Sequence, residues 1–182
     1  MRREVLSRRD GLGAEKRIEM SIAAGELAAS VIEFQPGDVV SGFWPIRSEI
    51  DPRPLMAEIQ RRGVRLCLPV VLDRETIIFR ELVRGAPLVD AGFGTIGPGE
   101  EARVLDPTIM LVPLAAFDKD GGRLGYGAGH YDRAIDKLIA KGQRPRLIGV
   151  AFGVQKVDRV PVEKHDQLLD MIITESGIIN VK

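Results

Sequence analysis

The run Ile109–Val112 is the feature that most constrains the fold, because all of its residues are apolar. A strand with one face in water alternates apolar and polar residues, so a short, wholly apolar run indicates a strand covered on both faces. Sheets built from such strands are mostly parallel. Residues 64–68, 146–152 and 170–174 form further runs of strand length. The pattern therefore predicts an α/β fold.

Segments with helical periodicity alternate with these strands. Residues 14–34 repeat Ile18, Ile22 and Ile32 at helical spacing, which is typical of an amphipathic helix. The other predicted elements are strands over 38–44 and 76–82, a short helix from Pro52 to Gly63, a helix over 130–141, and loops over 85–107 and 113–129. This alternation predicts a single domain, residues 1–182, in which a mostly parallel sheet carries helices on both faces.

The charge balance limits the kinds of ligand. Lys and Arg together number 26, as do Asp and Glu, so no global positive field favours nucleic acid or an anionic membrane surface. The single cysteine, Cys67, lies in an apolar run and is interpreted as a buried strand residue. Residues 1–10 lack the apolar core of a signal peptide, and no run reaches the roughly 18 apolar residues of a membrane span. We expect a cytoplasmic protein that binds neither nucleic acid nor membrane.

Residues 117–135 carry the chemistry that the sequence suggests. They join a predicted buried strand to a predicted helix, the place where open α/β sheets bind ligands. Gly125, Gly127 and Gly129 alternate, which lets the backbone turn its N–H groups toward phosphate oxygens, although such glycines also serve as plain turns. The segment lacks the Lys-Ser/Thr ending of a P-loop and the glycine spacing of a dinucleotide fingerprint.

Two charged neighbours favour a nucleotide over a plain turn. Arg123 offers a planar cation suited to phosphate oxygens, and Asp132 offers an oxygen ligand for the magnesium that accompanies a nucleotide. Taken alone, Asp132 is equally explained as an acid in the first turn of a helix, where it stabilises the helix dipole. The order of the neighbouring residues decides between these interpretations.

That order resembles the signature of the 5-formyltetrahydrofolate cyclo-ligase family. The segment carrying it runs through Pro113, Phe117-Asp118 and Gly121 to Arg-Leu-Gly-Tyr-Gly-Ala-Gly-His-Tyr-Asp-Arg at 123–133. Similar segments follow the family order at Arg8-Arg9 with Leu12, at 48–51, at 92–98 and from Val160-Pro161 to Asp170. The resemblance covers nearly the whole chain, and it implies a three-layer α/β/α sandwich, in agreement with the order of predicted elements.

The resemblance also implies roles for individual residues. Arg123 and Tyr131 are the expected catalytic residues. The expected ATP site consists of Arg2, Arg3, Arg123, Leu124, Gly125, Tyr126, Gly127, Ala128, Gly129, His130 and Tyr131. The expected folate site consists of Trp44, Glu49, Tyr126, Gly127, Ala128, Gly129 and His130. Asp132 and Asp166 are the expected magnesium ligands. The alternatives are that Trp44 belongs to the core, that Glu49 is a solvated loop acid and that Asp166 caps a turn.

Two positions depart from the family pattern. The family usually carries a lysine and then an arginine near its N-terminus for the ATP phosphates; here no lysine precedes Arg2 and Arg3, and one of these is expected to serve as the arginine. His130 stands where the family commonly has tyrosine, and it keeps a ring with a polar tip.

The resemblance implies a monomeric, magnesium-dependent enzyme that uses ATP to convert 5-formyltetrahydrofolate into 5,10-methenyltetrahydrofolate, with release of ADP and phosphate. Two alternatives belong to other classes. One is a sugar-phosphate enzyme on a related open sheet that hydrolyses no nucleotide. The other is a relative that binds folate or nucleotide without turnover.

Overall fold

A seven-stranded sheet in the order β11-β10-β9-β6-β1-β2-β3 forms the centre of the computed structural model, which describes residues 1–181. The strands are β1 (Val39–Ser41), β2 (Arg65–Val71), β3 (Ile77–Glu81), β6 (Ile109–Val112), β9 (Arg146–Val150), β10 (Met171–Thr174) and β11 (Gly177–Asn180). Neighbouring strands from β10 to β2 run parallel, and the edge strands β11 and β3 are antiparallel. The predicted mostly parallel sheet is confirmed.

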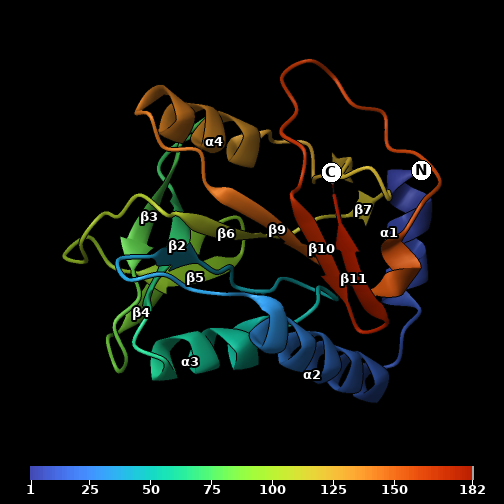
Figure 1. The fold of residues 1–182 in the computed structure, drawn as a ribbon, viewed down its shortest axis with the longest axis horizontal. Helices are drawn as coiled ribbons and strands as arrows, with labels where there is room; N and C mark the ends of the chain where they lie inside the picture. The colour runs from blue at the N-terminus through green and yellow to red at the C-terminus, as the bar shows by residue number, and fades with distance from the viewer. Residues whose placement is uncertain (182) are drawn as a thin grey trace.

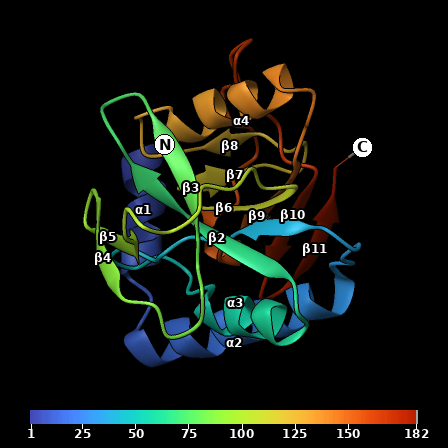
Figure 2. The same ribbon diagram turned by 90° about the vertical axis from the view of Figure 1, so that its left-hand side faces the viewer.

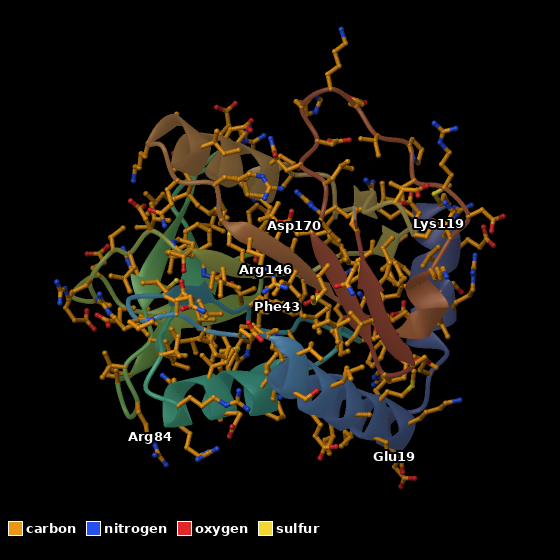
Figure 3. The ribbon with its side chains drawn as sticks, viewed as in Figure 1. Glu19, Phe43, Arg84, Lys119, Arg146 and Asp170 are labelled. Atoms are coloured by element: carbon orange, nitrogen blue, oxygen red, sulfur yellow. The ribbon has the colours of Figure 1, made fainter. Side chains whose placement is uncertain are left out.

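Helices cover both faces of this sheet (Figures 1 and 2). Helices α2 (Ala14–Val31) and α3 (Arg53–Arg61) lie on one face, and α4 (His130–Ala140) lies on the other. A hydrophobic cluster fills each interlayer space, one including Phe43 and the other Ile135. Figure 3 shows Phe43 in the interior and Glu19, Arg84 and Lys119 at the periphery. The predicted three-layer sandwich is therefore confirmed.

Several short elements were not predicted. They are α1 (Arg2–Asp10), the hairpin of β4 (Leu88–Gly92) and β5 (Thr95–Pro98), the hairpin of β7 (Ala116–Phe117) and β8 (Arg123–Leu124), the 3-10 turn η1 (Gly153–Gln155) and β11. The prediction of loops over 85–107 and 113–129 is therefore wrong where these segments form the two hairpins. Both hairpins are punctuated by glycine, and α1 is mostly charged, so neither type shows the apolar periodicity that identifies a longer element. None of the helices in the described part of the chain could cross a bilayer.

The order of the strands places a crevice between β1 and β6. From β1 the chain passes through α3 to β2 on one side, and from β6 it passes through α4 to β9 on the other. Successive strands are thus added to the sheet in one direction from β1 and in the opposite direction from β6. The loops that leave the carboxyl ends of β1 and β6 therefore separate at this point. These loops, residues 42–52 and 113–129, contain Glu49 and the glycine-rich segment.

Candidate active site

The glycine-rich loop connects β8 to α4 and depends on two backbone conformations that favour glycine. Gly127 has φ of 105° and Gly129 has φ of 66°, both in the region that side chains with a Cβ rarely adopt. Gly129 also stands at the N-cap of α4, so the loop leads directly into the positive end of a helix dipole. The predicted helix start at His130 is confirmed.

Arg123 and Asp132 form a buried ion pair beside this loop. The guanidinium Nη2 of Arg123 lies 2.6 Å from Oδ1 of Asp132, and the side chains are 6% and 16% exposed. The same carboxylate oxygen accepts the backbone N–H of Gln167 at 3.0 Å. Asp132 is therefore more than an acid in the first turn of its helix, because it links the glycine-rich segment to the loop that precedes β10.

Two polar atoms near this pair have no hydrogen-bond partner within residues 1–181. They are Nε of Arg123 and the hydroxyl of Tyr131, and both are buried. A buried donor without a partner costs roughly 1–3 kcal/mol, so unpaired polar groups concentrate where a ligand supplies the partner. Burial also raises the pKa of the Tyr131 hydroxyl, which therefore keeps its proton at neutral pH. The two atoms belong to Arg123 and Tyr131, the residues expected to be catalytic.

The two predicted magnesium ligands lie on adjacent segments. Asp166 precedes Gln167, whose N–H reaches Asp132, while the Asp166 carboxylate accepts the N–H of Glu163 at 2.7 Å. Within the described residues, no group of three His, Cys, Asp or Glu side chains could hold a metal ion. Magnesium is commonly held by one or two carboxylates together with substrate phosphates and water, so the two aspartates fit a metal that arrives with a nucleotide.

Helix α1 contributes two arginines to the same end of the sheet. Arg2 donates from Nε to the carbonyl oxygen of Gly125 at 2.9 Å. Arg9, which is buried, donates from Nη1 to the Tyr126 hydroxyl at 2.6 Å and from Nε to Ser48 Oγ at 3.0 Å. Of the two arginines expected at the ATP phosphates, both are exposed, and Arg2 is the one that donates to the glycine-rich loop.

Glu49 is buried at the end of the loop that follows β1. Its carboxylate accepts the N–H of Ile46 at 2.9 Å. Burial raises the pKa of Glu49 above its usual range, although the Tyr126 hydroxyl, the Ile46 N–H and the charge of Arg9 each favour ionisation. The interpretation of Glu49 as a solvated loop acid is therefore wrong.

Trp44 lies in the same loop and is partly buried against the first hydrophobic cluster. The guanidinium of Arg53 lies over its ring at 5.0 Å from the centroid, a cation–π arrangement. Trp44 therefore makes contacts with the core, and its expected role in the folate site stays a prediction.

The other end of the glycine-rich loop contacts two turns that are distant in sequence. Nε2 of His130 lies 2.9 Å from the Arg74 carbonyl oxygen, and the rings of His130 and Phe93 are 5.4 Å apart. Arg133 donates to the carbonyl oxygens of Ala128 at 2.6 Å and Glu75 at 2.8 Å. Arg9 and Arg133 lie in segments that resemble the family, but the sequence predicts a role for neither, because their partners are distant in sequence.

A surface hollow with a volume of about 630 Å³ lies elsewhere, between α3 and the β2–β3 edge. Four of its five charged lining residues pair with one another, Arg61 with Glu58 and Arg65 with Glu81. The unpaired buried groups and the loops at the reversal point are all at the β1–β6 crevice, so we place the candidate active site there.

An open, mostly parallel sheet with a glycine-rich strand-to-helix loop at its reversal point defines an α/β protein of the kind that binds phosphate-bearing ligands. Comparison with known families is more specific. The model of the 5-formyltetrahydrofolate cyclo-ligase family matches residues 1–175, and the chain belongs to this family.

Individual relatives agree with this assignment. The 5-formyltetrahydrofolate cyclo-ligase of Escherichia coli K12 is 28% identical over 180 residues, which cover 96% of this chain and 98% of the relative. That of Saccharomyces cerevisiae is 42% identical over 84 residues, which cover 44% of this chain and 39% of the relative. The solved structure of Aquifex aeolicus 5,10-methenyltetrahydrofolate synthetase superposes with a TM-score of 0.84 at 30% identity, covering 100% of this chain and 91% of that one.

Proposed function

We propose that this chain catalyses the reaction of its family, the ATP-dependent cyclisation of 5-formyltetrahydrofolate to 5,10-methenyltetrahydrofolate with release of ADP and phosphate. The observation that carries the proposal is the convergence of three segments at the β1–β6 crevice. These are the N-terminal helix with Arg2 and Arg9, the loop with Glu49, and the glycine-rich loop with Arg123.

The chemistry requires activation of a poor leaving group. The formyl oxygen attacks the γ-phosphorus of ATP and releases ADP; N10 of the folate then attacks the activated carbon, the ring closes and inorganic phosphate leaves with the former formyl oxygen. Enzymes promote phosphoryl transfer mainly by positioning the reactants and neutralising charge. Arg2, Arg123 and the N–H groups of the glycine-rich loop suit that role, because they are cations and donors at the start of a helix.

The remaining residues fit the two ends of the site. Glu49 and Trp44 offer a carboxylate and an aromatic edge to the pterin, a flat ring that donates hydrogen bonds. The unpaired Arg123 Nε and Tyr131 hydroxyl are donors available to substrate oxygens. Asp132 and Asp166 would hold magnesium, which would offset the charge of the triphosphate. Monomeric state and cytoplasmic location remain expectations.

The decisive experiment is a turnover assay. We expect the purified protein with Mg-ATP to convert 5-formyltetrahydrofolate into a product with the ultraviolet absorbance of the methenyl form, with phosphate released in equal amount and only when the folate is present. Phosphate release without folate would favour a different nucleotide-using enzyme. Folate binding, measured by the fluorescence of the single tryptophan, Trp44, without any product would favour a relative that has lost turnover.

A further inference from the structure

Arg9 occupies an unusual position for an arginine, because it is 2% exposed although most residues of its helix are charged. Buried arginines need partners for their N–H groups, and the partners of Arg9 come from two distant segments. Nε donates to Ser48 Oγ at 3.0 Å, and Nη1 donates to the Tyr126 hydroxyl at 2.6 Å. One guanidinium thus bridges the loop after β1 and the glycine-rich loop.

Arg9 orients the hydroxyl groups of both its partners. The Tyr126 oxygen accepts from Arg9, which leaves the phenol hydrogen free to face Glu49, the group whose charge and hydrogen bonding most affect the Tyr126 hydroxyl after burial. The Ser48 oxygen likewise accepts from Arg9 and donates its own hydrogen to Asp10. Arg9 therefore sets the direction of two hydroxyl groups on either side of Glu49.

The backbone supports the same arrangement. Arg47, which directly precedes Ser48, has φ of 54°, a conformation that costs a residue with a Cβ roughly 1–3 kcal/mol and persists only where surrounding contacts hold it. Helix α1 is in turn fixed by the fully buried Val5 and packs against η1 and β7. The strained turn at Arg47 is thus connected through Ser48 and Arg9 to a helix that packs against the rest of the fold.

We propose that Arg9 is a positioning residue for the folate end of the site: its guanidinium holds the Ser48-Glu49 segment and Tyr126 in fixed relation, so that Glu49 meets the substrate in one orientation. The proposal rests on the proposed function in taking Glu49 as a folate contact. Arg9 itself contacts the two loops, and its effect reaches the substrate through Glu49 and Tyr126.

The test uses Arg9→Met, with Arg8→Met as the matched control. Arg8 lies on the same helix but is exposed and pairs with Glu4. We expect Arg9→Met to raise KM for 5-formyltetrahydrofolate about tenfold, the equivalent of one hydrogen bond to a charged group, and to leave KM for ATP within about twofold. Arg8→Met should change neither value. A proportional loss of folded protein and activity, with both KM values unchanged, would overturn the proposal.

A double-mutant cycle with Tyr126→Phe separates positioning from general stability. If Arg9 acts through the Tyr126 hydroxyl, Arg9→Met should raise KM for the folate less in the Tyr126→Phe background than in the wild type. Additive effects would refute coupling through that hydroxyl. If Arg9→Met does not fold, Arg9→Lys and Ser48→Ala can replace it, because each removes one of the two hydrogen bonds that Arg9 makes to Ser48 and Tyr126. Each variant should raise KM for the folate and leave KM for ATP unchanged. An unchanged KM for the folate in both variants would overturn the proposal.

A binding measurement keeps this proposal distinct from the proposed function. Quenching of Trp44 fluorescence by 5-formyltetrahydrofolate without ATP reports affinity whether or not turnover occurs. Loss of affinity in Arg9→Met but not in Arg8→Met would support the positioning role even if the wild type made no product. Equal affinity in both variants and the wild type would contradict it even if the enzyme were fully active.

Discussion

At the scale of single residues, Glu49 shows how burial prepares a carboxylate for a ligand. Water is replaced around it by the loop after β1, and the resulting desolvation outweighs the Tyr126 hydroxyl, the Ile46 N–H and the Arg9 charge, so that the net pKa is raised. A group in this state is costly to the empty protein and gains from a partner that donates hydrogen bonds.

This cost gives Glu49→Gln a predictable pH signature. The folded-state pKa lies above the ordinary value of 4.5, so the folded protein binds more protons than the unfolded chain in that window, and stability falls as pH rises through it. Glutamine does not ionise, so the variant does not lose stability in this way as pH rises. We expect the melting temperatures of variant and wild type to converge below pH 4.5 and the variant to gain relative stability toward neutral pH, while its affinity for the folate falls. A melting difference that is independent of pH would contradict the assignment.

Asp166 is a cleaner test of the magnesium site than Asp132. Asparagine at position 132 would leave Arg123 as a buried cation without its carboxylate, and breaking a buried pair typically costs about 3–5 kcal/mol. Asparagine at 166 keeps an oxygen for the N–H of Glu163.

We therefore expect Asp166→Asn to raise the magnesium concentration for half-maximal turnover about tenfold, equivalent to 1.4 kcal/mol, with little change in melting temperature. Glu163→Gln, an exposed neighbour in the same turn, serves as the control. An unchanged magnesium requirement in Asp166→Asn would identify the residue as a turn acid only.

At the scale of elements, the β7–β8 hairpin explains part of the family signature as structure. Asp118 is 2% exposed, and its carboxylate accepts the backbone N–H groups of Asp120, Gly122 and Val160 at 2.8–2.9 Å. These bonds fold the turn and tie it to the segment after η1. Asp118 therefore has a structural role in the signature, because its carboxylate shapes the turn that leads to Arg123.

Removing this carboxylate should destabilise the protein. Asp118→Ala leaves three donors without their partner, and we expect the free energy of unfolding to fall by about 3 kcal/mol or more. In Asp120→Ala the free energy of unfolding should fall by less than about 0.5 kcal/mol, because Asp120 and its ion pair with Lys119 are both exposed. Urea denaturation measures both, and equal losses in the two variants would contradict this role.

The elements also show which parts of the fold sequence reasoning could reach. β6 was predicted with its observed bounds and α4 to within one residue, because an apolar run and a glycine-to-helix boundary are local signals. Helix α1 was not predicted, since only Val5 among its buried residues is apolar and its stability comes from contacts more than a hundred residues away. The partners of Arg9 were out of reach for the same reason, as were the ion pair of Arg123 and the bond from His130 to Arg74.

At the scale of the whole molecule, the site joins segments from the first and last thirds of the chain. Ligands that bind only the folded state stabilise it, by about 2.7 kcal/mol at a concentration one hundred times Kd. The gain should be unevenly distributed. Arg2 and Arg9 bind α1 by hydrogen bonds to the glycine-rich loop, whereas α3 reaches the loop after β1 through the ring contact of its first residue, Arg53, with Trp44. Mg-ATP with 5-formyltetrahydrofolate should therefore slow amide hydrogen exchange in α1 more than in α3. Equal slowing in both helices would indicate uniform stabilisation.

The attachment of α1 has a further consequence for biosynthesis. The bonds from Arg2 to Gly125 and from Arg9 to Tyr126 close intervals of 123 and 117 residues. On the ribosome, α1 emerges before the glycine-rich loop and η1, so it meets its partners only after both have been translated. Closing so long an interval is entropically costly until the intervening sheet is assembled. The folate end of the site is therefore completed late, and a nascent chain that stalls before the glycine-rich loop contains β1, β2, β3 and β6 of the central sheet but lacks the partners of Arg2 and Arg9.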